Sequence, residues 1–174
     1  METRLKEGLS GKEIENFSKR FLNRDFAGVY SMDNIDLQKI RDKLAAAKYF
    51  AAASCIVNTS EQNEKGEHWI AIHINNSGRA EYFDSYGLPP IQRGVKQLCY
   101  SLATEYDWND QPVQDIMDQS SVACGYHALF YLYVKQCEPK MKLGDIVNNF
   151  YSINNLKLND LFAVSFIENK LISQ

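Results

Sequence analysis

The sequence has no long hydrophobic run, and this absence sets the first limit on the protein. No apolar stretch approaches the about 18 residues that suggest a membrane-spanning helix. The N-terminal stretch METRLKEGLSGKE is too polar for a signal peptide. No repeat, low-complexity segment or linker divides the chain, so we expect a soluble, non-secreted protein with a single domain over residues 1–174.

The sequence also lacks a large net charge and recognisable cofactor-binding motifs. The formal net charge is -3, which gives no basic field for a nucleic-acid partner. None of the four cysteines forms a C-x-x-C pair, a pattern that suits reduced intracellular thiols better than a disulfide framework. There is no phosphate-binding glycine loop and no metal-ligand cluster, so we expect no cofactor and no metal.

The apolar patterning predicts an α+β fold. Ser10 and Glu13 form a capping box that starts a helix over 11–22. The alternating segments HWIAIHINN and RAEYFDSY, joined by Asn76-Ser77-Gly78, predict a β-hairpin. The other expected elements are helices at 35–48, 91–106, 124–135, 142–151 and 159–171 and strands at 49–57 and 111–117, whereas FAGVYS reads as a turn. Strands in the middle with helices on both sides predict a central sheet flanked by helices.

Cys124 lies where a polar run meets a strongly apolar segment, in MDQSSVACGYHALFYLYVKQ. If a helix begins there, its free backbone amides and its dipole favour thiolate over thiol. The same amides, with the Cys124 N–H, can bind an oxyanion. Gly125 then allows the close approach of a substrate or a neighbouring strand. The alternative is a cysteine that only packs in the core, as free cysteines often do.

Only three histidines are available as a catalytic base. A hairpin folded about residue 76 places His68 opposite Asp84, and a register change of one residue would make Ser85 the partner. Either register puts His68 and Asp84 at the same end of neighbouring strands, where a carboxylate can orient an imidazole.

The other two histidines are weaker candidates for the base. His73 is five residues further along the same strand, and we interpret it as structural because the odd offset turns it to the other side of the sheet. His127 lies three residues after Cys124 on a similar helical face, but no third group obviously orients it.

The order His-Trp, an acid after a hairpin, then Gln and Cys-Gly resembles the adenovirus-protease and SUMO-protease group of cysteine peptidases. The likeness is greatest to the adenovirus maturation protease and its relatives in virophages and polinton-type elements. It runs through FAGVYSMDNI (26–35), CIVNTSEQNEKGEHWIAIHI (55–74), YFDSYGLPP (82–90) and QSSVACGYHALFYLYV (119–134). The resemblance implies a papain-like or adenain-like fold with the nucleophile at the N-terminus of a buried helix.

The resemblance also implies a role for each matching residue. Cys124 becomes the nucleophile, His68 the general base and Asp84 the acid that orients it. Trp69, directly after the histidine, lines the substrate channel together with Gly125.

The family uses a glutamine six or seven residues before the cysteine to complete the oxyanion hole. Here the pattern departs, because Gln119 is five residues before Cys124 and Gln114 is ten before it. Gln119 is preferred, because a small deletion is the simpler change. Gln114 is the alternative if DIMDQ is an inserted bulge.

By resemblance, the protein is a viral maturation endopeptidase whose partners are capsid or core precursors. It would act in the host cytoplasm or viral factory and be packaged in the virion. The alternatives are a protease for SUMO- or ubiquitin-like proteins and, less favoured, an acyltransferase of the same fold group. The family's activation by a viral peptide and by DNA has no support in this sequence, and no membrane partner is expected.

Overall fold

The computed structural model describes residues 8–22, 25–46, 52–64, 66, 68–117 and 121–172. Its centre is a mixed five-stranded sheet with the spatial order β1-β2-β3-β4-β5, in which the inner pairs are antiparallel and the two edge strands are parallel to their neighbours. The strands are β1 (Phe26–Ser31), β2 (Ala52–Asn58), β3 (Trp69–Asn75), β4 (Arg79–Phe83) and β5 (Glu105–Trp108). The helices are α1 (Gly11–Phe21), α2 (Leu37–Ala46), α3 (Arg93–Leu102), α4 (Cys124–Cys137), α5 (Leu143–Phe150) and α6 (Leu156–Ile172).

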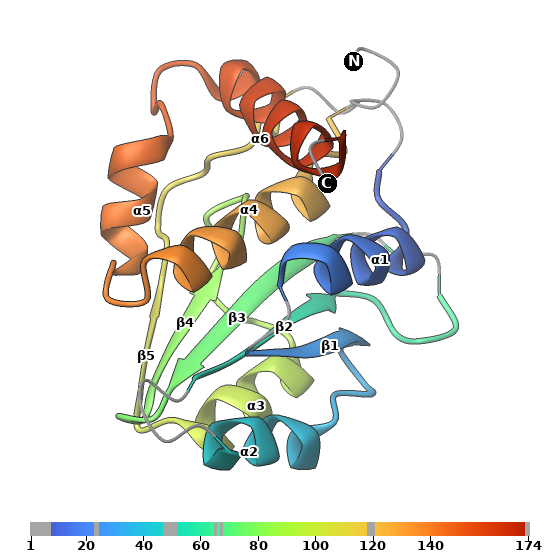
Figure 1. The fold of residues 1–174 in the computed structure, drawn as a ribbon, viewed down its shortest axis with the longest axis vertical. Coiled ribbons are helices and arrows are strands. Elements are labelled where there is room, and N and C mark those ends of the chain that lie inside the picture. The colour runs from blue at the N-terminus through green and yellow to red at the C-terminus, as the bar shows by residue number, and fades with distance from the viewer. Residues whose placement is uncertain are drawn as a thin grey trace.

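The sheet separates two apolar layers, as Figure 1 shows. One core joins the sheet to α1, α4, α5 and α6, and the other joins it to α2 and α3. Strand β2 is buried along its whole length because both of its faces are covered. This α+β arrangement of a mixed sheet between helices is the predicted fold class.

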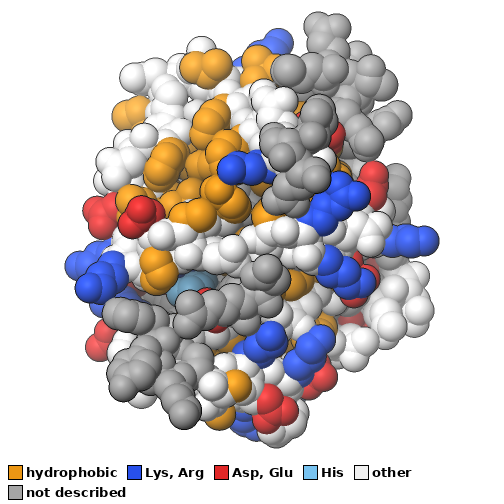
Figure 2. Space-filling model, viewed as in Figure 1, with side chains coloured by type: hydrophobic (Ala, Val, Ile, Leu, Met, Phe, Trp, Pro, Cys, Tyr) orange, Lys and Arg blue, Asp and Glu red, His pale blue; other side chains and the backbone are white. Residues whose placement is uncertain are grey.

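Helix α4 is buried nearly all round, which explains why its apolar residues do not form a single stripe. Figure 2 shows apolar side chains gathered on this side of the molecule, over the layer of α4, α5 and α6. Phe130 of α4 packs edge-on against Phe150 of α5 and Phe162 and Phe166 of α6, with ring centroids 5.5, 5.0 and 5.0 Å apart. These contacts hold the outer helices on α4.

Most predicted helices are confirmed. The capping box is present, with the Ser10 hydroxyl accepting from the Glu13 N–H and the Glu13 carboxylate accepting from the Ser10 N–H at 2.9 Å. Helix α3 is shorter than predicted, because the chain leaves it at Leu102 and enters β5 at Glu105. No helix within the described ranges is long and apolar enough to cross a membrane.

Two predictions about strands are wrong. FAGVYS forms β1 rather than a turn, because it pairs with β2 through an irregular register at Gly28, whose φ is 152°. Residues 111–117 do not form a strand, and the fifth strand is instead β5, which pairs with β4. Both observed strands lie at the edges of the sheet, where pairing with a neighbour decides the structure more than local pattern does.

The hairpin is confirmed, but its register differs from the prediction. His73 pairs with Glu81, and the connection closes with a bond of 3.1 Å from the Gly78 N–H to the Asn75 carbonyl, so the turn is centred further along the chain than residue 76. Continuing this register would place Tyr86, rather than Asp84, opposite His68. The change is an even number of residues, so every side chain keeps its predicted face.

Candidate active site

Cys124 is the first residue of α4 and is 6% exposed. The N-cap is Ala123, and no side chain of the described residues caps this end of the helix. The first-turn amides of α4 therefore have no intrahelical acceptor and are directed toward the region of the thiol. Such a helix start stabilises an anion beside it.

His68 and Asp84 meet at the end of the sheet, just before β3 begins and just after β4 ends. The His68 Nε2 lies 2.7 Å from the Asp84 Oδ1, and the two residues are 8% and 2% exposed. An ionised carboxylate only accepts, so this contact assigns the proton on Nε2 and leaves Nδ1 as the basic nitrogen. Nδ1 is buried and makes no hydrogen bond of ordinary geometry within the described part of the chain.

The Cys124 side chain nevertheless lies close enough to act on His68. Burial alone would lower the pKa of His68, but the hydrogen bond to Asp84 and the nearby Cys124 side chain outweigh it and raise that pKa to about 9. The negative charges of Cys124 and Asp84 add to the same effect. The bond between His68 and Cys124 is not formed at full hydrogen-bond geometry, as is common in catalytic pairs without substrate. The three groups can carry a thiolate beside an imidazolium, with the carboxylate behind it.

The raised pKa of His68 predicts a titration that can be observed directly. The imidazolium is stabilised in the folded state, so its contribution to stability is complete below about pH 6.5 and is lost as pH rises through about 9. Nuclear magnetic resonance of the imidazole protons should show one histidine titrating near pH 9, and this signal should vanish in His68→Gln. In Asp84→Asn the same midpoint should move to lower pH. An unchanged midpoint in Asp84→Asn would contradict the assigned interaction.

Tyr86 and Asn109 contact the His68–Asp84 pair and help to orient it. Neither residue is predicted from the sequence. The Tyr86 ring stacks on the His68 ring with centroids 4.0 Å apart, and its backbone N–H donates to the Asp84 Oδ1 at 2.8 Å. Asn109 accepts from the Asp84 N–H at 2.9 Å and donates to the Asp84 carbonyl at 2.6 Å. These contacts hold the carboxylate and the imidazole in one orientation, and only the true hairpin register could have predicted the Tyr86 stack.

A cleft of about 540 Å³ opens beside Cys124 and Tyr86. Trp69 lines it, and its indole N–H donates to the Leu9 carbonyl at 2.8 Å, which brings the N-terminal segment 8–11 into the wall. Sequence reasoning did not anticipate this segment. Gly125 is not among the residues that line the cleft, because the space beside its α-carbon is occupied by Leu9 and Ile14. Its lack of a side chain serves this packing.

Of the two glutamines considered for the oxyanion hole, only Gln114 lies within the described residues. Gln119 lies outside the described residues. Gln114 is fully buried and does not line the cleft. Its carbonyl accepts from the Ser85 hydroxyl at 2.7 Å, and its amide donates to the Ser121 carbonyl at 3.1 Å and hydroxyl at 3.2 Å. Gln114 thus ties the residue after Asp84 to the segment just before Cys124.

His127 belongs to a second buried pair, with Asp160 of α6. Its Nε2 lies 2.8 Å from the Asp160 Oδ1, and the Asp160 Oδ2 accepts from the Ser121 hydroxyl at 2.6 Å. His127 is therefore already engaged away from Cys124, and it fixes the approach of the chain to α4.

Removing Asp160 should destabilise the protein strongly. Asp160→Ala leaves a buried imidazole nitrogen and the Ser121 hydroxyl without their acceptor, which we expect to lower the free energy of unfolding by about 3 kcal/mol. Asp145→Ala, at an exposed position in the first turn of α5, is the matched control and should change it by less than about 1 kcal/mol. Urea unfolding monitored by circular dichroism measures both, and equal losses would contradict the role of the pair.

The remaining histidine and thiols lie outside the cleft. His73 is buried near Lys135, and burial followed by that positive charge lowers its pKa to about 3. Burial raises the pKa of Cys55, and it raises that of Cys99 to about 11. Cys137 is exposed at the far end of α4. Among the described residues, no group of three or more histidine, cysteine or acidic side chains is placed to hold a metal ion.

The proteins that this chain resembles in sequence are named as cysteine proteases. No family model matches the chain. It is 29% identical over 131 residues to a protein of African swine fever virus (a tick isolate from Malawi) named "Cysteine protease". It is 28% identical over 131 residues to the counterpart of a pig isolate from Kenya, named "SUMO-1 cysteine protease". Each match covers 69% of this chain and 46% of the relative, so the chain spans about half the length of the curated relatives it matches.

A solved structure supports the fold. The effector protein ChlaDUB of Chlamydia abortus superposes with a TM-score of 0.56 at 13% identity, over 92% of this chain and 91% of that one. At this identity the likeness concerns the fold alone, and it confirms the predicted α+β class.

Proposed function

We propose that this protein is a cysteine endopeptidase that cleaves a protein substrate through a thioester acyl-enzyme. The observation that carries the proposal is the 2.7 Å contact between His68 and Asp84 beside Cys124, at the start of α4, where the N-cap residue Ala123 provides no side-chain cap. A buried imidazole held by a carboxylate and acting on a thiol is the arrangement that nucleophilic cysteine catalysis requires. The similarity to viral cysteine proteases supports it.

The reaction starts from the thiolate of Cys124, with the proton on His68. The thiolate attacks the carbonyl carbon of the scissile peptide bond, and the backbone N–H of Cys124 donates to the oxyanion. His68 then gives its proton to the leaving amine, and the acyl group stays on sulfur as a thioester. Water, deprotonated by His68, releases the acyl group and restores the enzyme. Asp84 keeps the imidazole oriented and stabilises its cationic form throughout.

For the second donor of the oxyanion hole we keep Gln119, the residue that the resemblance favours. Gln114 has both ends of its amide engaged by Ser85 and Ser121, which supports a positioning role for it instead. One such donor contributes about 3 kcal/mol to transition-state stabilisation in comparable sites. Gln119→Ala should therefore lower kcat by about 100-fold if it is the donor.

We propose viral capsid or core precursors as the substrate class, processed in the host cytoplasm or viral factory and in the virion. Trp69 lines the same cleft as Cys124, and a large side chain there favours cleavage next to small residues such as glycine. The second candidate is processing or deconjugation of a ubiquitin-like protein, and the name of the Kenyan relative favours it.

One experiment separates the two substrate classes. Wild type and Cys124→Ala are incubated with a viral major capsid precursor and, separately, with SUMO-1 carrying a C-terminal fluorophore. Discrete precursor fragments from wild type alone, seen by intact mass, would support maturation. Release of fluorophore without precursor cleavage would support the ubiquitin-like class. Equal cleavage by both variants would overturn the proposed chemistry.

A further inference from the structure

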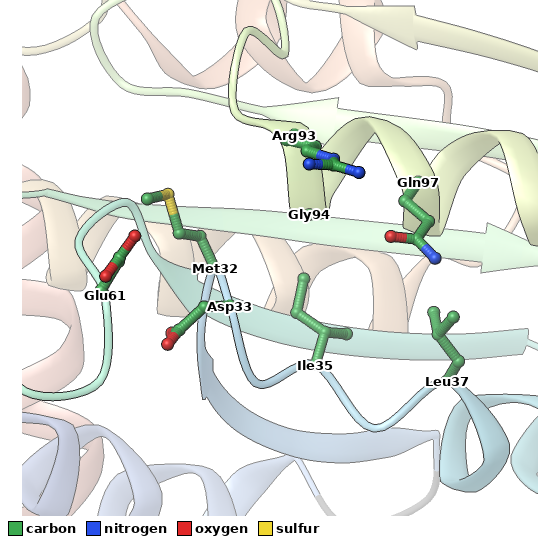
Figure 3. A pocket seen from close by; sticks show the side chains of 8 residues that line it. All are labelled: Met32, Asp33, Ile35, Leu37, Glu61, Arg93, Gly94 and Gln97. Atoms are coloured by element: carbon green, nitrogen blue, oxygen red, sulfur yellow. The ribbon is translucent and has the colours of Figure 1, made fainter.

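A second pocket of about 300 Å³ lies beside the cleft and contains none of the catalytic residues. Figure 3 shows its walls: Met32 and Ile35 come from the connection between β1 and α2, Leu37 is the first residue of α2, and Arg93 and Gln97 come from α3. Glu61, from the connection between β2 and β3, lines both this pocket and the cleft that contains Cys124. The two cavities are therefore neighbours that share one wall.

Hydrogen bonds and close packing hold this shared wall in place. The Gln62 N–H donates to the Asp33 Oδ1 at 3.0 Å, and the Met32 N–H donates to the Ser60 carbonyl at 3.4 Å, so the two connections are tied to each other. On the opposite side, the start of α3 lies so close to the Met32 carbonyl that a β-carbon at Gly94 would overlap it. The pocket consequently has fixed sides before any ligand arrives.

The charged side chains around the shared wall are negative. Glu61 and Glu64 line the cleft, Asp33 stands beside Glu61 at the pocket, and no lysine or arginine is among the described residues that line the cleft. Neither Asp33 nor Glu61 forms an ion pair with any cation of the described residues. Arg93 stands across the pocket on α3, away from the side that adjoins the cleft (Figure 3). An extended peptide that leaves the cleft over Glu61 would meet carboxylates first and an apolar hollow next.

We propose that this pocket extends the substrate cleft: it binds an apolar side chain of the protein substrate some residues from the scissile bond, while a lysine or arginine of the same segment pairs with Glu61 and Asp33. The inference rests on the proposed protease function and adds a sequence preference to it. Carboxylates recognise a basic side chain through charge-assisted hydrogen bonds. The apolar side chain gains by leaving water for the surface formed by Met32, Ile35 and Leu37.

The test uses quenched fluorescent peptides of one cleaved sequence, in which a Lys-Leu pair is moved through the positions on each side of the scissile bond. At one placement kcat/KM of wild type should rise about tenfold over the matching Glu-Gly peptide. The double variant Asp33→Lys with Glu61→Lys should lose or invert this ratio. Ile35→Trp, which fills the hollow, should lower the gain from leucine. Glu105→Lys, at an exposed position of β5 at the sheet end away from Asp84, is the control for one charge reversal far from the pocket and should keep the ratio.

Turnover of a short glycine p-nitrophenyl ester, too small to reach the pocket, tests the catalytic site separately from the pocket. A lost peptide preference in the double variant, measured as the ratio of kcat/KM for the two peptides within that variant, supports the pocket. The wild-type ratio in the double variant, with ester turnover present, overturns the pocket and leaves the protease function standing. Absence of ester turnover in wild type would overturn the protease function itself.

Discussion

Replacing Cys124 by alanine should abolish cleavage, with a loss in kcat of at least about 1,000-fold, because no other group in the site can form the thioester. In the proposed mechanism the sulfur is the reacting atom, so a correctly folded variant keeps the cleft, the His68–Asp84 pair and the amides of α4 but has no nucleophile. The assay is turnover of the glycine ester and of whichever protein substrate is cleaved. Circular dichroism confirms that Cys124→Ala keeps the fold.

The chain provides a matched control for this change in Cys137, the exposed thiol at the other end of the same helix. Cys137→Ala removes an accessible sulfur and should leave turnover within about twofold of wild type, as a surface change far from the site would. Cys55 and Cys99 are buried thiols whose pKa values are raised by burial, which argues against either as a second nucleophile. Equal losses in Cys124→Ala and Cys137→Ala would contradict the assignment.

Replacing His68 by alanine should lower kcat nearly as much as replacing Cys124 does. In the proposed mechanism His68 carries the proton that leaves the thiol and returns to the departing amine. Members of such a set act as a unit, so we expect a loss in kcat of about 1,000-fold or more. The same change removes the partner of Asp84, whose 2.7 Å contact would be lost. Turnover measured across the pH range checks the prediction, because the variant should also lose the dependence that arises from the titration of His68 near pH 9.

His73 supplies the matched control for His68, since it lies on β3, is similarly buried and is held neutral near Lys135. His73→Gln should retain turnover within a fewfold of wild type even where it lowers thermal stability. An equal loss of turnover in His73→Gln and His68→Ala, with both proteins folded, would contradict a specific catalytic role for His68.

Much of the fold follows from local signals in the sequence. The capping box of Ser10 and Glu13 fixes the start of α1, and the alternation on either side of Asn76-Ser77-Gly78 fixes the hairpin. Helix α4 begins at Cys124 because the apolar run begins there. The placement of His68 and Asp84 at one end of the sheet survived a register error of two residues, since both lie beyond the paired part of the hairpin.

The rest depends on contacts between distant segments, which no local pattern encodes. FAGVYS becomes a strand only because β2 offers a parallel partner. The stack of Tyr86 on His68 depends on the register of the hairpin. The wall that Leu9 contributes to the cleft depends on the Trp69 indole, sixty residues away in the chain.

The most direct test of the central claim is to find the acyl group itself. Wild-type protein is mixed with the glycine p-nitrophenyl ester, quenched in acid within seconds, digested and mapped by tandem mass spectrometry. We expect one acyl adduct, on the Cys124 sulfur, which is absent in Cys124→Ala and forms far more slowly in His68→Ala. An adduct spread over Cys137 and surface lysines, with none enriched on Cys124, would contradict the central claim.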